Sequence, residues 1–282
     1  MRAILVACVL VATTQAHADS SRAWSVAQQH LPASTTSIVA IDVDKAMASS
    51  LSSFAEPLAT ALGARATFES LKTTCKIDPV KAVDGLVIVE GAASDVGAYY
   101  VSLDGSVGRA AITECLQKTA LDTKLTSVWL DDDVLVIPAK PTDKAMLATF
   151  TSGAAGKKAF GKSALGKLAA KANKGGALWF ASAKSRAVLG MTMKSGHGSL
   201  EVADKTLALS IETTFRSASE AAAVAKIVNE QIIALLASGQ LDAVVMEMLN
   251  KVSITTKGAL LVGHGSVPDD QVMSLFGALT RP

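Results

Sequence analysis

The chain has 282 residues, half of them apolar, which is enough for one large domain or two of ordinary size. Aromatic residues make up only 4%, which argues against an aromatic-lined platform for sugars or nucleic-acid bases. The formal net charge is only +2, so there is no electrostatic case for nucleic-acid binding.

The first residues, 1–18, are typical of a secretory signal peptide. Arg2 supplies a basic start, about ten apolar residues follow, and Ala16–Ala18 form a small-x-small cleavage site. We expect export to the periplasm or to the outside of the cell, with a mature chain that starts near Asp19. A lipid-attachment box ending at Cys8 offers the alternative of a lipid anchor, which the intact cleavage site downstream argues against. No later segment approaches the ~20 uninterrupted apolar residues of a transmembrane helix.

Removal of this leader leaves two cysteines, Cys75 and Cys115. An even number of cysteines in an oxidising compartment favours a bridge, so we predict a Cys75–Cys115 disulfide. Closing a loop of that size contributes about 3–4 kcal/mol in the chain-entropy model. The alternative is two separate buried thiols that behave as small hydrophobic residues.

In chain order, the first half predicts a helix over Ser20–Gln29, a strand over Ser37–Val43 and helical stretches as far as Cys75. Two pairs of strands follow, GLVIVE with AYYVSLD and SVWL with VLVIPA, and a helix over Ser106–Leu121 lies between the pairs. The second pair turns at Asp131–Asp133, and a short helix closes this half.

The second half predicts the same kinds of element. They are a helix over Ser163–Ala172, a strand GALWFAS, a helix over Ala183–Thr192, a hairpin of SLEVAD and TLALSIET, an amphipathic helix from Ser217, a helix over Leu241–Asn250, a hairpin of VSITT and ALLVGH, and a closing helix from Pro268. Ser217 and Glu220 have the spacing of a capping box.

Both halves therefore have one order of elements: helix, strand, helix, two strands, helix, two strands, helix. This order predicts an internal duplication, supported locally by PTDKAM at Pro141 and PDDQVM at Pro268. The predicted fold is α+β, with two mainly antiparallel sheets, each covered by helices on one face. We predict a first repeat over residues 19–151, a connecting segment with a short helix over 152–174, and a second repeat over 175–282.

The connecting segment contains six lysines and no acidic residue. A charge run of this kind is typical of a solvated face or a linker. The alternative is a weak contact with an anionic surface, such as lipid headgroups. The candidates for that contact are Lys157, Lys158, Lys162 and Lys167.

Three histidines remain after the leader, and two of them lie in the tetrapeptide GHGS. We expect His197 and His264 on glycine-flanked, accessible backbone near strand ends, where a duplication could let them share a metal ion. The simpler interpretation is two polar residues in glycine turns, because a specific metal site needs three or more protein ligands. Neither histidine has a recognisable acid and serine nearby in the sequence, so no cofactor or catalytic residue is predicted.

The acidic residues also have structural interpretations. Asp131–Asp133 lack the ligand spacing of a calcium loop and are typical of a solvated turn. Asp42 and Asp44 resemble a carboxylate pair, but Asp44 is expected to cap the helix that follows it. The sequence contains no nucleophile elbow, phosphate-binding loop or dinucleotide-binding motif.

The segment Leu31–Ala46, LPASTTSIVAIDVDKA, resembles the opening of exported bacterial proteins of uncharacterised function. The resemblance implies export in a bacterium and transfers no functional residue. The lack of reactive clusters favours a non-catalytic exported protein that binds a partner or acts as a scaffold. One alternative is a carrier of an apolar ligand or lipid, and another is a metal enzyme or hydrolase that uses His197 or His264.

Overall fold

The computed structural model describes residues 21–54, 65–91, 97–119, 126–140, 142–153, 156–203, 205–238 and 243–271. The predicted signal peptide and Cys8 lie outside these residues. The chain forms two compact units with their boundary between Ala170 and Lys171. The described part mixes helices with strands that pair in antiparallel fashion, which confirms the predicted α+β class.

The N-terminal unit has five strands in the order β1-β2-β3-β5-β4. They are β1 Thr35–Asp42, β2 Val83–Gly91, β3 Gly97–Leu103, β4 Val128–Trp129 and β5 Val134–Pro138. Its described helices are α2 Arg22–His30, α3 Val43–Met47, η1 Ser50–Phe54, α5 Arg65–Thr74, α6 Pro79–Ala82, α7 Arg109–Lys118, α8 Lys144–Thr151, α9 Gly156–Lys162 and α10 Ala164–Ala169.

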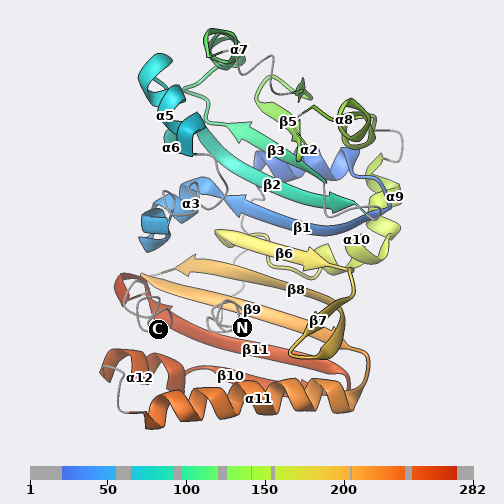
Figure 1. Cartoon of the computed structure of the whole chain (residues 1–282), viewed down its shortest axis with the longest axis vertical. Helices are drawn as coiled ribbons and strands as arrows, with labels where there is room; N and C mark the ends of the chain where they lie inside the picture. The colour runs from blue at the N-terminus through green and yellow to red at the C-terminus, as the bar shows by residue number, and fades with distance from the viewer. Residues whose placement is uncertain are drawn as a thin grey trace. The chain divides into compact units, whose positions relative to one another are not determined.

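One face of these N-terminal strands is buried at its centre. Val87 on β2, Tyr100 on β3 and Val136 on β5 lie opposite one another, and each is 0% exposed. Helix α2 packs on β2 and β3, and α8 packs on β3 and β5 (Figure 1). The Tyr100 hydroxyl donates a 2.6 Å hydrogen bond to the carbonyl of Phe150 in α8, which ties that helix to the middle of the sheet.

The C-terminal unit has the strand order β6-β8-β9-β11-β10, with the short β7 paired to β8. Its strands are β6 Leu178–Ser182, β7 Arg186–Val188, β8 Met191–Ala203, β9 Thr206–Phe215, β10 Ser253–Lys257 and β11 Leu260–Pro268. Its described helices are α11 Ala218–Ala237, α12 Ala243–Asn250 and η2 Asp269–Gln271.

Helix α11 covers one face of this second set of strands. It lies along β10 and β11 and also contacts β9 (Figure 1). Val224, Val228 and Ile232 form its buried stripe, as the helical spacing of apolar residues predicts. Ser217 caps the helix by accepting a 3.2 Å bond from the Glu220 N–H. The Glu220 carboxylate does not return this bond, because it accepts from the Thr192 N–H and pairs with Arg216.

The two units share their strand order and one irregularity. The strands of each unit follow the sheet order first, second, third, fifth, fourth, when β7 is set aside. The ladder between the second and third strands shifts register at Val83/Gly85 in one unit and at Met193/Ser195 in the other.

The backbone hydrogen bonds beside this shift are also repeated. Asp104 N–H donates to the Ala82 carbonyl at 3.0 Å, and Arg216 N–H donates to the Thr192 carbonyl at 2.9 Å. In the same way the Leu103 N–H donates to the backbone carbonyl of Asp133 at 2.9 Å, and the Phe215 N–H donates to the backbone carbonyl of Ala259 at 2.8 Å. The β2–β3 and β8–β9 ladders can therefore be matched residue by residue.

The predicted helix over Ala183–Thr192 is wrong, because this segment forms β7 and the start of β8. Leu189 and Gly190 have φ values of 50° and 82°. Two consecutive positive φ angles are typical of the two-residue turn that joins hairpin strands. The closing helix was predicted to start at Pro268, but β11 continues through that residue before η2, and residues beyond 271 are outside the described structure.

Candidate functional site

The two histidines of the GHGS repeats lie inside strands, which corrects both the expected position near strand ends and the alternative of glycine turns. His197 lies within β8 and His264 within β11. The packing around β8 leaves no room for a side chain at Gly198. A Cβ atom there would meet the Ser210 carbonyl oxygen at 2.2 Å and the Phe180 ring at 2.7 Å.

An acidic residue faces His197 across the β8–β9 hairpin. Glu212 is its direct partner in the ladder, and Nε2 of His197 lies 3.4 Å from Oε2 of Glu212. Glu212 is not near His197 in the sequence, and the pairing of β8 with β9 brings the two together. The sequence contained the signal, because the register of the predicted hairpin would have placed these two residues opposite each other.

Three more polar residues lie on the same face of the strands as this pair. Ser199 is two residues beyond His197 on β8, Ser210 lies opposite it on β9, and His264 lies opposite Ser210 on β11. Nδ1 of His264 is buried and has no hydrogen-bond partner among the described residues. This polar row is the candidate site that the sequence pointed to.

His197 and His264 do not lie on neighbouring strands. They stand on β8 and β11 with β9 between them, so two strand spacings of roughly 4.8 Å separate their backbones. No group of three or more His, Cys, Asp or Glu side chains in the described ranges is placed to hold a metal ion.

Burial lowers the pKa of His197 below the ordinary value for histidine. The charge of Glu212 opposes this effect, whereas the charge of Lys171 adds to it. His197 as a whole residue is 8% exposed. The lowered pKa favours the neutral form of the imidazole.

This pKa predicts an acid-dependent loss of stability. Unfolded chains bind a proton at His197 near pH 6.5, but the folded chain resists protonation until the pH is lower. The free energy of unfolding should therefore fall as the pH drops below about 6.5. Urea denaturation between pH 7.5 and 5 should show a smaller fall for His197→Gln than for wild type. Parallel pH profiles for the two proteins would contradict this assignment.

The acidic residues singled out in the sequence have structural partners. Arg22 of α2 pairs with Asp131 and Asp133 at the tip of the β4–β5 hairpin, a contact that the sequence could not reveal. The helix cap is Asp42 and not Asp44, because the Asp42 carboxylate accepts from the Lys45 N–H at 3.1 Å.

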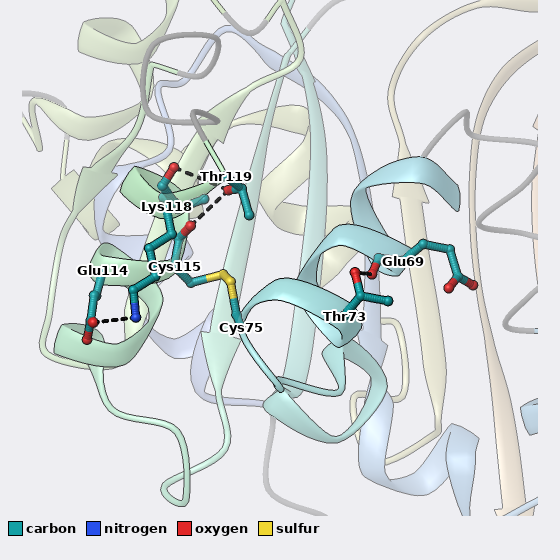
Figure 2. The surroundings of a disulfide bond; sticks show 8 residues. Glu69, Thr73, Cys75, Glu114, Cys115, Lys118 and Thr119 are labelled. Carbon is teal, nitrogen blue, oxygen red and sulfur yellow. Dashed lines mark hydrogen bonds and ion pairs between the residues drawn. A yellow bond between two sulfur atoms is a disulfide. The ribbon is translucent and has the colours of Figure 1, made fainter.

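The predicted disulfide between Cys75 and Cys115 is confirmed. Figure 2 shows it joining the residue after α5 to the middle of α7, with Cα atoms 5.5 Å apart. Cys115 is buried, and its carbonyl accepts a 2.8 Å bond from the Thr119 hydroxyl. The bridge fixes α7 beside α5.

The lysines of the connecting segment lie partly on described helices. Lys162 ends α9 and Lys167 lies in α10, and both are exposed. The side chains of Lys157 and Lys158 are outside the described structure. Contact of these lysines with an anionic surface stays a prediction.

A second candidate surface was not singled out from the sequence. It lies on the N-terminal sheet, opposite the face that carries Tyr100, and we call it the apolar N-terminal face. Its members are half-buried apolar side chains from β1, β2, β3 and β5: Val39, Ile41, Leu86, Ile88, Tyr99, Val101 and Ile137.

Comparison with known proteins gives a likeness of fold. No protein-family model matches the sequence, and no curated protein matches it. Crystal form I of TP0453 is similar in structure, with 8% sequence identity, a TM-score of 0.50 and coverage of 94% of this chain and 100% of that chain. Crystal form III of TP0453 gives the same identity and coverage with a TM-score of 0.46.

The helices in the described ranges include none with the length and apolar character needed to cross a membrane.

Proposed function

We propose that this chain is an exported, non-catalytic protein that binds a partner or acts as a scaffold in the periplasm or outside the cell. The observation that carries the proposal is the apolar N-terminal face, where seven apolar side chains of four strands stay only half-buried. Contiguous apolar patches of this kind mark interaction sites on soluble proteins.

Export is supported by the disulfide, since such bonds persist in oxidising compartments. The features of residues 1–18 point the same way. A general base needs its free nitrogen within reach of a substrate proton. His197 is largely buried and contacts Glu212, and this supports a binding role in place of a catalytic one.

We also infer that the two units arose by duplication of one module. The shared strand order, the shared register shift and the repeated hydrogen bonds support it. Experimental coordinates would test it by superposition of the two units. The inference would be contradicted if this superposition did not place the Ile88–Tyr99 pair on the Gly198–Ile211 pair.

The proposed function predicts which substitutions abolish binding. The tagged protein, cross-linked in the organism that carries the gene, should retain its cross-linked partner when His197 and His264 are both replaced by alanine. It should lose that partner when Ile88→Thr and Val101→Thr remove apolar area. Mass spectrometry of the cross-linked species provides the measurement, and circular dichroism checks that each variant is folded. Loss of the partner only in the histidine variant would instead favour a function centred on the polar row.

A further inference from the structure

We propose that two copies of this chain associate edge to edge, with β10 of one copy paired antiparallel to β10 of the other. Self-association through this strand goes beyond the proposed function, which is carried by the apolar N-terminal face. Three features of the C-terminal unit support it: the main-chain groups that β10 leaves open, the sequence of this strand, and an exposed apolar side chain on α11.

The ladder between β9 and β11 shows which main-chain groups of β11 turn toward β10. In an antiparallel ladder, pairs that exchange hydrogen bonds alternate with pairs that do not. The Phe215 N–H donates to the Ala259 carbonyl at the end of this ladder, so these two residues are a bonded pair. Leu261 therefore also turns its main chain to β9, whereas Leu260 and Val262 turn theirs to β10.

Strand β10 in turn bonds to β11 through alternate residues. Thr255 lies opposite Val262, so its N–H and C=O groups are used within the sheet. The N–H and C=O groups of Ile254 and Thr256 point away from β11. None of these outward groups has a hydrogen-bond partner among the described residues. Because β10 is the last strand of its sheet order, an open row of donors and acceptors runs along this edge.

The corresponding edge of the N-terminal unit is blunted. Its edge strand β4 has only two residues, and Arg109 stacks on Trp129 of that strand at 5.4 Å. β10 has five residues, SITTK, with a charge only at its end. Edge strands are protected from pairing when they are very short or carry charges. The middle of β10 has neither protection, and its β-branched Ile254–Thr256 run favours strand pairing.

One antiparallel register uses every outward group of β10. It sets Thr255 opposite Thr255 of the second copy, so an Ile254–Thr256 pair forms on each side of the twofold axis and exchanges both of its N–H···O bonds. Ser253 then faces Lys257 of the second copy, and no like charges lie opposite each other. The contact is self-complementary, as a closed twofold dimer requires.

Helix α11 supplies apolar area at the same edge. It lies along β10 at the outer border of the C-terminal unit (Figure 1). Successive helix residues are about 100° apart, so Gln231 and Ile233 lie on opposite sides of the buried Ile232. Oε1 of Gln231 is buried, whereas Ile233 is 62% exposed. Because β9 and β11 lie on the inner side of the helix, we place its open side, which carries Ile233, beyond β10.

Edge pairing would bring the open sides of two α11 helices together. An antiparallel strand pair has its twofold axis perpendicular to the sheet. The two copies of α11 therefore run antiparallel on the same face of the joined sheet, one on each side of the axis. Ile233 of both copies then leaves water, and apolar burial of roughly 25 cal/mol per Å² adds to the main-chain hydrogen bonds.

The test measures the mass of the full chain, purified after export, by sedimentation velocity over a series of concentrations. Thr256→Pro removes an outward N–H, a change that an edge strand tolerates because this group takes no part in the β10–β11 ladder. Thr256→Val keeps the N–H and is the matched control. We expect wild type and Thr256→Val to form dimers as the concentration rises. Thr256→Pro should have a dissociation constant at least tenfold higher, and circular dichroism checks that it is folded.

A charge exchange tests the register. Thr255 is exposed, and Thr255→Lys sets two positive charges opposite each other at the twofold axis, whereas Thr255→Glu sets two negative charges there. Each variant alone should be monomeric at concentrations where wild type is dimeric. An equal mixture of the two sets opposite charges against each other and should restore the dimer.

Two further measurements locate the interface. Ile233→Lys should raise the dissociation constant at least tenfold, whereas Val128→Lys on the exposed edge strand β4 should leave it unchanged. Amide hydrogen exchange at Ile254 and Thr256 should slow as the dimer forms, because only then do these N–H groups gain acceptors.

Edge pairing is refuted if wild type stays monomeric throughout the series, if Thr256→Pro dimerises like wild type, or if the Thr255→Lys and Thr255→Glu variants do not pair. A dimer lost in Ile88→Thr/Val101→Thr but kept in Thr256→Pro would place the interface on the apolar N-terminal face and would also refute it. So would a strand of another protein cross-linked to β10 of a monomeric chain. The proposed function fails by a separate result, a cross-linked partner that survives the Ile88→Thr/Val101→Thr substitutions.

Discussion

Replacing both Cys75 and Cys115 with alanine is expected to lower the free energy of unfolding by about 3–4 kcal/mol. The bridge joins residues 40 apart in the sequence, and a loop of that length restricts the unfolded chain by roughly this amount in the chain-entropy model. Alanine is chosen because Cys115 is buried, where a serine hydroxyl would add a desolvation cost. Urea denaturation monitored by tryptophan fluorescence measures the difference.

Wild-type protein treated with a reductant is the matched control, since it loses the bridge and keeps both sulfur atoms. It should unfold at a urea concentration close to that of the double variant. The two proteins differ only by two buried or half-buried thiols. A loss below about 1 kcal/mol in both would show that residual structure in the unfolded chain already holds these segments together.

The strands of this fold could be predicted because their apolar periodicity is local. β9 alternates Leu207, Leu209 and Ile211 with smaller or polar residues, and the observed strand matches the predicted one. The β4–β5 hairpin turns at the predicted acidic residues. The disulfide could be predicted from the number of cysteines and the expected compartment, without any knowledge of packing.

Features that depend on register or on distant contacts could not be predicted in this way. His197 lies outside the predicted strand SLEVAD, so its pairing with Glu212 follows only when the predicted hairpin is extended past Ser199. Arg22 reaches Asp133 across 111 positions of the chain. The segment before Leu189 contains alanine, lysine and arginine, which favour a helix, but sheet pairing with β8 overrides that preference.

The apolar N-terminal face shows a signal that was present and misread. GLVIVE was assigned to a strand correctly, yet its apolar residues on both sides already indicated cover on both faces. Sequence alone could not say which elements provide that cover. The C-terminal unit allows a comparison, because there helix α11 packs on the strands that correspond to those of the N-terminal unit.

Tyr100→Ala is expected to lower the free energy of unfolding by about 3–5 kcal/mol, the usual cost of truncating a buried aromatic side chain. Tyr100 is 0% exposed, and its ring packs between the sheet and the helices that cover it. Tyr100→Phe keeps the ring but removes the donor to the Phe150 carbonyl. That carbonyl would lose its side-chain partner, at a cost of about 1–3 kcal/mol.

The same residue predicts a loss of stability at alkaline pH. Burial raises the pKa of Tyr100 far above the usual value for tyrosine, whereas the unfolded chain releases this proton near pH 10. Above that pH the unfolded state binds fewer protons than the folded state, so the free energy of unfolding falls as the pH rises. Denaturation of wild type and Tyr100→Phe between pH 8 and 11 separates the two effects. The hydrogen-bond cost is present at every pH, but the alkaline slope should be smaller in Tyr100→Phe, and equal slopes would place the titrating group elsewhere.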